Sequence, residues 1–158
     1  MADSPPAGTT LVLMGDRLRF LATAAESGGA MTAIEVVMPP GGGPPGLHAH
    51  DPAELVVVQE GTITALRGSP PAPERIDATP GDAVVIPGGT PHTIRNLSDR
   101  PARYVTVFSP SGGIEGFLVS AAGAVEGAPG GPPSPELVAR VLALAEEHGM
   151  TMFPPAAQ

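Results

Sequence analysis

The chain has 158 residues, the size of one domain, and a formal charge of −8 at pH 7. It has no cysteine and its eight basic residues are all arginine, which excludes disulfides, thiolate nucleophiles, cysteine metal sites and lysine Schiff bases. The acidic balance argues against a nucleic-acid partner. No apolar run reaches the ~20 residues of a membrane span, and the N-terminus lacks a signal-peptide pattern. We therefore expect a cytoplasmic protein without nucleic-acid or membrane partners.

Short apolar runs rich in β-branched residues follow one another along the first two thirds of the chain. Clusters of glycine and proline, which favour turns, separate these runs. This pattern is typical of an all-β sandwich or barrel, and eight or so strands fit a jelly roll. The predicted strands are Leu11–Met14, Leu18–Ala22, Met31–Met38, Leu55–Val58, Ile63–Leu66, Ala83–Ile86, His92–Ile94 and Tyr104–Phe108.

One predicted strand, Leu55–Val58, is continuously apolar. Such a run is typical of a strand buried on both faces, or of one that faces a pocket on one side and a second sheet on the other. Side chains alternate along a strand, so Glu54, Val56 and Val58 are expected to share a face. A pocket on that side would have a small, aliphatic floor.

The C-terminal part of the chain has a different character. Gly127–Pro133 has the composition of a linker, and Ser134 followed by Pro135 is a helix-start signal. Apolar residues then recur with helical spacing as far as Ala145, and Gly149 is a stop signal, which predicts a helix of about 13–15 residues. We expect a barrel domain over 1–125, with the linker and a helix packed on the barrel over 126–158. Residues 112–121 fit a short helix or a strand equally well.

Three of the four histidines are candidate metal ligands. His48 and His50 are two residues apart, so in a strand both imidazoles project from one face, and Glu54 has the same parity beyond a bend at Asp51-Pro52. His92 follows a Pro-Gly-Gly turn about forty residues later. Three neutral imidazoles and one carboxylate form a complete ligand set for a divalent metal. The alternative is a barrel that holds these polar residues without a metal.

The first three candidates lie within a longer pattern of fixed spacing. It runs from Gly42 through five residues to His48-Ala49-His50, three more to Glu54 and six more to Gly61. Gly61 comes at the end of a predicted strand, where a hairpin favours a residue with positive φ. The glycine therefore has a structural reason to stand at that position.

A second pattern surrounds His92. It runs from Gly81 through five residues to Pro87-Gly88-Gly89, two more to His92 and three more to Asn96, which we expect to tie down a loop. Every fixed position of the two motifs of the cupin superfamily is present, so the chain resembles that superfamily over roughly residues 10–110. The resemblance implies an antiparallel jelly-roll (double-stranded β-helix) barrel, here with a C-terminal helix.

The resemblance also implies that His48, His50, Glu54 and His92 bind one divalent transition metal inside the barrel. The ligand set suits iron, manganese, nickel, copper or zinc and does not choose among them. A softer resemblance is to small bacterial monocupins of the quercetinase-like or polyketide-tailoring type, carried by Pro39–Pro45 before His48 and by the tail Gly149–Pro155. Such relatives carry aromatic residues after the glutamate, where this chain has Leu55–Val58.

Three functions follow from this resemblance, each with a small-molecule substrate or ligand. The first is a dioxygenase that takes dioxygen as a second partner, with Glu54 as general base. The second is a redox-neutral cyclase, isomerase or lyase, with Glu54 and Tyr104 as the acid–base groups. The third is a binding module without catalysis. We also expect a homodimer, with Thr9–Met14 as a candidate edge segment for pairing.

Overall fold

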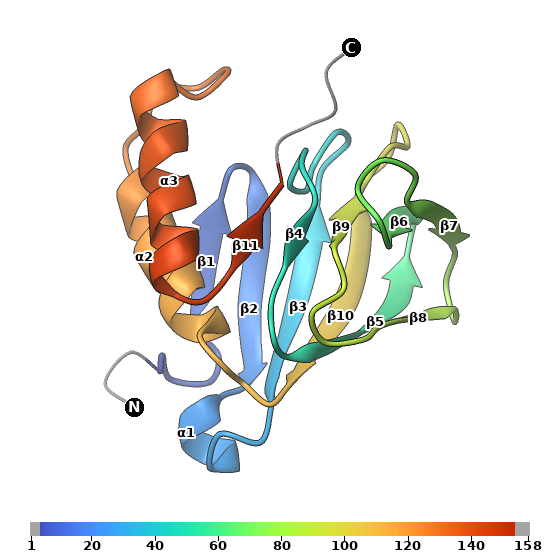
Figure 1. The fold of residues 1–158 in the computed structure, drawn as a ribbon, viewed down its shortest axis with the longest axis horizontal. Helices are drawn as coiled ribbons and strands as arrows, with labels where there is room; N and C mark the ends of the chain where they lie inside the picture. Colours follow the sequence, from blue (N-terminus) through green and yellow to red (C-terminus); the bar gives the residue numbers. More distant parts are fainter. Residues whose placement is uncertain (1–3, 154–158) are drawn as a thin grey trace.

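A computed structural model describes residues 4–153 of the chain. Residues 1–3 and 154–158, which include the end of the Gly149–Pro155 tail, lie outside the described residues. Two antiparallel sheets face each other, and Figure 1 shows the smaller one in front of the larger. This arrangement confirms the all-β jelly roll predicted from the sequence.

The larger sheet has six strands. Its spatial order is β1 (Thr10–Leu13), β2 (Asp16–Ala22), β3 (Thr32–Met38), β10 (Ala102–Ser109), β5 (Ala53–Glu60) and β8 (Ala83–Ile86). Strands β3 and β5 both pair with β10, which lies more than forty residues after them in the sequence. The smaller sheet has the order β11 (Thr151–Met152), β4 (His48–Ala49), β9 (His92–Arg95), β6 (Ile63–Arg67) and β7 (Glu74–Ala78).

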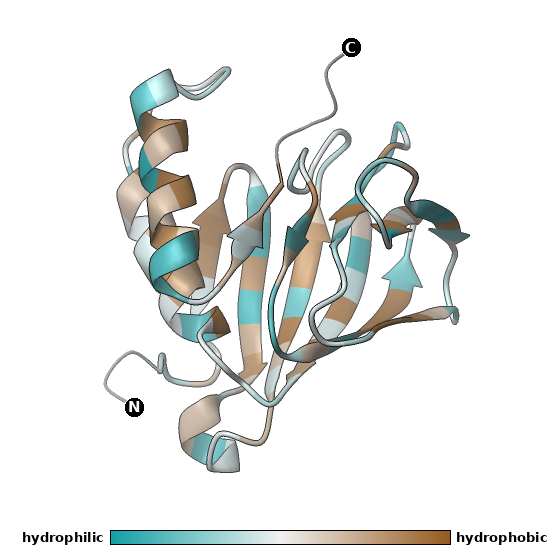
Figure 2. Ribbon diagram, viewed as in Figure 1, coloured by the Kyte–Doolittle hydropathy of each residue, from teal (hydrophilic) through white to brown (hydrophobic). Residues whose placement is uncertain are grey.

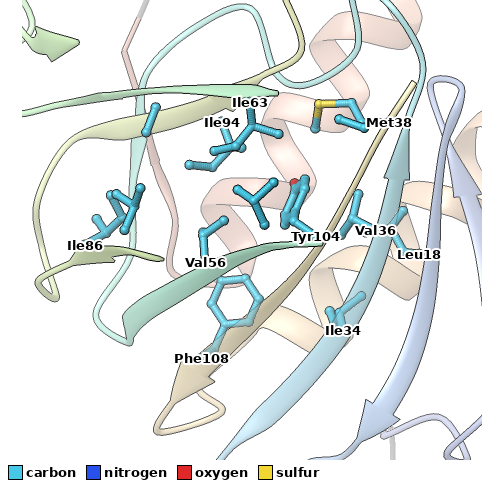
Figure 3. Close-up of a cluster of buried hydrophobic side chains, with 14 of the residues drawn as sticks. Leu18, Ile34, Val36, Met38, Val56, Ile63, Ile86, Ile94, Tyr104 and Phe108 are labelled. Carbon is cyan, nitrogen blue, oxygen red and sulfur yellow. The ribbon is translucent and has the colours of Figure 1, made fainter. Parts of the chain in front are cut away.

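Strand alternation produces the core between the sheets. The inward residues of the larger sheet are buried, among them Phe20, Ile34, Val56 and Ile86, which are all 0% exposed. Figure 3 shows aliphatic side chains from both sheets gathered around the rings of Tyr104 and Phe108. Burying this apolar surface is the main stabilisation of the fold, at ~25 cal/mol per Å².

The outward face of the larger sheet is different. Val56 and Val58 point inward and are buried, but Leu55 points outward and is 37% exposed. Within the described residues, the expectation that Leu55–Val58 is buried on both faces is therefore wrong. The banding along the strands in Figure 2 follows the same alternation.

Three helices accompany the sheets: α1 (Ala24–Ser27), α2 (Ile114–Val125) and α3 (Pro135–Glu147). Most of the ambiguous segment 112–121 forms the first part of α2, which begins at Ile114. The predicted C-terminal helix is confirmed as α3, and the N-cap residue Ser134 before it accepts a hydrogen bond from the Leu137 N–H. Helices α2 and α3 pack together beside β1 (Figure 1). Within residues 4–153, none of these helices combines the length and apolar character needed to cross a bilayer.

Candidate metal centre

Three histidines meet where β4 and β9 pair. His48 and His92 are opposite one another in the register of these two strands, and His50 directly follows β4. One ligand nitrogen from each lies within 4.8 Å of the other two. The ring centroids of His48 and His92 are 4.5 Å apart, and those of His50 and His92 are 4.8 Å apart. The three histidines thus form a cluster that can hold one metal ion, which we call the three-histidine cluster.

Glycines of the two motifs allow the surrounding loops to approach closely. A Cβ on Gly88 would lie 2.2 Å from the carbonyl oxygen of Asp51, and the neighbouring Gly89 N–H donates to the His50 carbonyl at 2.8 Å. A Cβ on Gly43 would lie 2.1 Å from the carbonyl oxygen of Ile94. Close backbone contacts of this kind hold the ends of β4 and β9 together, which positions the ligand-bearing residues.

Backbone carbonyls orient two of the imidazoles. His50 Nδ1 lies 2.9 Å from the Pro52 carbonyl oxygen, and His92 Nδ1 lies 2.8 Å from that of Thr90. Nδ1 donates in both contacts, so Nε2 of His50 presents its lone pair, whereas Nε2 of His92 faces the Glu54 carboxylate and donates to it until a metal takes the place of that proton. His50 Nε2 is buried without a hydrogen-bond partner. A buried acceptor left open beside two further imidazoles fits a bound cation.

Glu54 lies at the edge of the three-histidine cluster. Its Oε2 is 2.9 Å from His92 Nε2 and 3.4 Å from His50 Nε2. Its Oε1 accepts a hydrogen bond of 2.6 Å from the Thr106 hydroxyl. The side chain is only 6% exposed, so the carboxylate is held in place inside the barrel with one oxygen turned towards the imidazoles.

The charges of the cluster are strongly coupled. Burial would raise the pKa of the Glu54 carboxyl, but the neighbouring imidazoles of His50 and His92 outweigh it and hold that pKa below its usual range. Burial would lower the pKa of His92, but its contact with Glu54 raises that pKa instead. Burial lowers the pKa of His48 to about 3, so this imidazole is neutral over the physiological range. Neutral His48 and ionised Glu54 are the forms that bind metals.

Tyr104 and Phe108 both point into the barrel from β10 (Figure 3). The ring centroid of Phe108 is 5.5 Å from that of His50, whereas Tyr104 lies further along the strand. Burial raises the pKa of Tyr104 well above its ordinary value, and the charges of Glu54 and Asp16 add to this. The phenol therefore stays protonated and can act as a hydrogen-bond donor.

Three other polar residues that the sequence singled out lie outside the three-histidine cluster. The Asn96 amide donates to the carbonyl oxygens of Met38, at 3.0 Å, and Arg100, at 2.7 Å, which confirms that it ties down a loop. His148 stands at the C-terminal end of α3, and its Nδ1 is 2.8 Å from the Leu144 carbonyl oxygen. Asp51 is exposed, as its parity predicts.

The sequence reasoning missed the residues that support the candidate ligands. Thr106 shares the inward parity of Tyr104 and Phe108, so strand alternation was the signal that could have found it. Asp16, an inward residue of β2 near Gly43 and Arg95, was also missed, and its Oδ1 is buried without a hydrogen-bond partner. The carbonyls of Pro52 and Thr90 left no signal, because any residue type supplies a carbonyl.

Comparison with known protein families agrees with this fold and site. Residues 34–108, which contain all four candidate ligands, match the family model described as the cupin domain. Together with the jelly-roll fold, this match supports the cupin superfamily for the chain. A comparison with curated protein sequences gives no significant match.

Several solved structures share the fold. An oxalate decarboxylase variant from Bacillus subtilis aligns with a TM-score of 0.58 and 21% identity, over 68% of this chain and 29% of that one. The polyketide cyclase RemF from Streptomyces resistomycificus aligns with a TM-score of 0.52 and 22% identity, over 61% and 66%. A sugar phosphate isomerase from Silicibacter pomeroyi aligns with a TM-score of 0.51 and 23% identity, over 63% and 62%. The alignments span less than two thirds of each of these proteins, and at such identities they establish the fold alone.

Proposed function

We propose that the chain is a metal-dependent dioxygenase, quercetinase-like in its chemistry, that acts on a small hydroxylated organic molecule. The observation that carries this proposal is the three-histidine cluster with the Glu54 carboxylate at its edge, inside an apolar barrel. His48, His50, Glu54 and His92 would hold one divalent ion of iron, manganese, nickel, copper or zinc. The bound ion would supply a site that activates substrate and dioxygen.

The chain's own residues have distinct tasks in this reaction. Thr106 donates to Oε1 of Glu54, so Oε2, which faces His92, is the oxygen that would accept a proton from a substrate hydroxyl once a metal has displaced the His92 proton. Ile86, which is opposite Glu54 in the register of β5 and β8, and Val56 make the barrel interior apolar, an environment that favours dioxygen over water. Val56 and Val58 are fully packed, which favours a substrate smaller than a flavonol.

A second candidate is a redox-neutral cyclase or isomerase. The observation that favours it is the buried Tyr104 hydroxyl, which burial keeps protonated on the same strand face as the Glu54 partner Thr106. A base at Glu54 and an acid at Tyr104 would move a proton between two positions of one substrate. The shared fold with a polyketide cyclase and a sugar phosphate isomerase makes such substrates worth testing.

The test starts from metal-free protein, reloaded under nitrogen with each of the five metals in turn. Oxygen uptake is then measured with a panel of small phenols and enolisable carbonyl compounds. Uptake that matches substrate loss, is absent in His92→Ala and remains in His148→Ala would support the dioxygenase. Turnover that persists without oxygen would support the second candidate. Compounds that raise the melting temperature without being converted would indicate a binding module and contradict both.

A further inference from the structure

The edge where the two sheets end carries a pocket that the proposed function does not use. Strands β8 and β7 are the last strands of the larger and the smaller sheet, on the side of the molecule away from α2 and α3 (Figure 1). The pocket beside them has a volume of about 560 Å³, within the range of small-molecule sites. We call it the edge pocket. Its walls include three apolar residues and three polar residues, which are Ala72, Val85 and Pro87, and Arg67, Glu74 and Thr90.

Arg67 supplies the positive charge of the edge pocket, and it lies in the row of the candidate metal ligands. His48 is opposite His92 in the register of β4 and β9, and His92 is opposite Arg67 in that of β9 and β6. Arg67 also shares the parity of Ile63 and Ala65, which point into the barrel and are 0% exposed. Its own side chain is 30% exposed, so the guanidinium stands at the boundary between the barrel interior and the edge pocket.

Two contacts fix the position of this guanidinium. Nη1 of Arg67 donates to the Val85 carbonyl oxygen at 2.6 Å, which joins the smaller sheet to the free edge of β8. Nε donates to Oε2 of Glu74 at 3.1 Å. Among residues 4–153, no group accepts a hydrogen bond from Nη2. A carboxylate can form two parallel hydrogen bonds with the Nε–Nη2 side of a guanidinium, and Glu74 uses only half of that side.

Glu74 holds its half of the Nε–Nη2 side loosely. Its side chain is 61% exposed, and water screens an exposed ion pair so that it contributes little. A small carboxylate with a hydrocarbon body would also bury that body against Ala72, Val85 and Pro87, a gain that Glu74 in water does not have. The edge pocket therefore suits an external carboxylate better than the internal one.

Charge and shape together define the class of ligand. The chain carries −8, so most of its surface repels anions, and a fixed guanidinium with an open donor is the feature that attracts one. We propose that the edge pocket binds a small monocarboxylate with an apolar body. Its carboxylate takes the Nε–Nη2 side of Arg67, and Glu74 turns into solvent. The site is separate from the metal centre, so this proposal does not rest on the proposed reaction.

A titration of the zinc-loaded protein with benzoate tests the proposal, with NMR of the Ala72 and Val85 methyl groups as the readout. Benzoate should shift these signals saturably, whereas benzamide, which has the same shape without the charge, should not. Arg67→Gln should weaken benzoate binding at least about tenfold, as expected for the loss of charge-assisted hydrogen bonds. Arg75→Gln is the matched control and should bind benzoate like the wild type, because Arg75 makes a similar exposed pair with Asp77, at 3.2 Å, outside the edge pocket.

Two further variants separate ligand binding from other roles of these residues. Glu74→Gln removes the competing carboxylate, so benzoate binding should strengthen about two- to fivefold. If the pair of Arg67 and Glu74 only stabilised the fold, this variant would bind no better than the wild type. His50→Ala removes a candidate metal ligand on the other side of β9 from Arg67, and it should bind benzoate unchanged.

Several outcomes would overturn the proposal. They are the absence of a saturable shift with benzoate, equal binding of benzoate and benzamide, full affinity in Arg67→Gln, and unchanged or weaker binding in Glu74→Gln. Loss of binding in His50→Ala would place benzoate at the metal centre and would also overturn it. If Arg67→Gln does not fold, the Glu74→Gln variant and the comparison with benzamide still decide.

Discussion

Nε2 of His92 lies 2.9 Å from Oε2 of Glu54, and both side chains are almost fully buried. Burial opposes a charge on His92, but the contact with Glu54 raises its pKa above the ordinary 6.5. His92 is therefore protonated at pH values below that raised pKa, and a metal must displace the proton to bind.

We expect the number of protons released by zinc binding to fall with pH. Because the contact with Glu54 raises the pKa of His92, more protons should be released per metal at about pH 6 than at about pH 8. Titration calorimetry in buffers with different heats of ionisation measures this number. Glu54→Gln removes the carboxylate that raises the pKa, so it should release fewer protons at the lower pH. An unchanged number in that variant would contradict the assignment.

The four histidines provide an internal control for metal binding. His50→Ala and His92→Ala each remove one member of the three-histidine cluster, so both should lose bound metal in elemental analysis. His148→Ala should keep it, because His148 lies at the end of α3. Loss of metal in all three variants would point to unfolding, and retention in all three would contradict a centre at this cluster.

The hydroxyl of Thr106 supports Glu54, and Thr106→Val removes it at nearly constant volume. One oxygen of a buried carboxylate would lose its 2.6 Å donor. We expect metal affinity to fall about 10–100-fold and the free energy of unfolding to fall by about 1–3 kcal/mol. Thr64→Val is the control, because the buried Thr64 hydroxyl also donates to a carboxylate, but to that of Asp77 on the outer strand β7. Equal effects of both variants on metal affinity would contradict a role for Thr106 at the centre.

Asp16 makes the stability depend on pH in a predictable direction. Burial raises its pKa from 3.8 to about 6, against smaller opposing effects of the Gly43 N–H and Arg95. A raised pKa in the folded state means that Asp16 contributes stability below about pH 4, which is lost as the pH rises through about 6. Asp16→Asn should therefore become more stable than the wild type between pH 4 and pH 7, by about 1–2 kcal/mol after allowance for partial exposure. Urea unfolding at several pH values measures the difference, and a constant difference would contradict it.

A substitution at Gly43 tests whether the close packing of its loop against Ile94 on β9 stabilises the fold. An added Cβ would meet the Ile94 carbonyl oxygen at 2.1 Å, and φ is +93°. Gly43→Ala should cost at least about 3 kcal/mol of unfolding free energy through steric clash and backbone strain. Gly41→Ala, with φ of +76° and open space around it, should cost only about 1–2 kcal/mol. Similar losses at the two positions would mean that strain alone matters.

Much of the fold could be predicted because local signals agreed with the tertiary structure. Alternating β-branched residues predicted the long strands, and Ser134 followed by Pro135 predicted the start of α3. The resemblance carried by the two motifs implied that His48, His50 and His92 would meet. The strand and helix signals each lie within a short stretch of sequence, where the chemistry of the residues fixes the backbone.

Other features depend on pairings that a single stretch does not contain. Thr106 reaches Glu54 because β10 pairs with β5 in one particular register. Segment 112–121 was ambiguous because Gly116 and Val119 are poor helix formers, and its packing beside β1 decides for a helix. Strand β7 is mostly polar, so only its pairing with β6 reveals it.

Met152 on β11 pairs with His48 on β4, so the strand next to this candidate ligand is synthesised late. Strand β4 lies between β9 and β11, so one of its two neighbours leaves the ribosome about a hundred residues after His48 itself. Both motifs emerge well before that strand does, and domains fold as whole units during translation. A nascent chain can therefore expose all four candidate ligands before β11 has paired with β4.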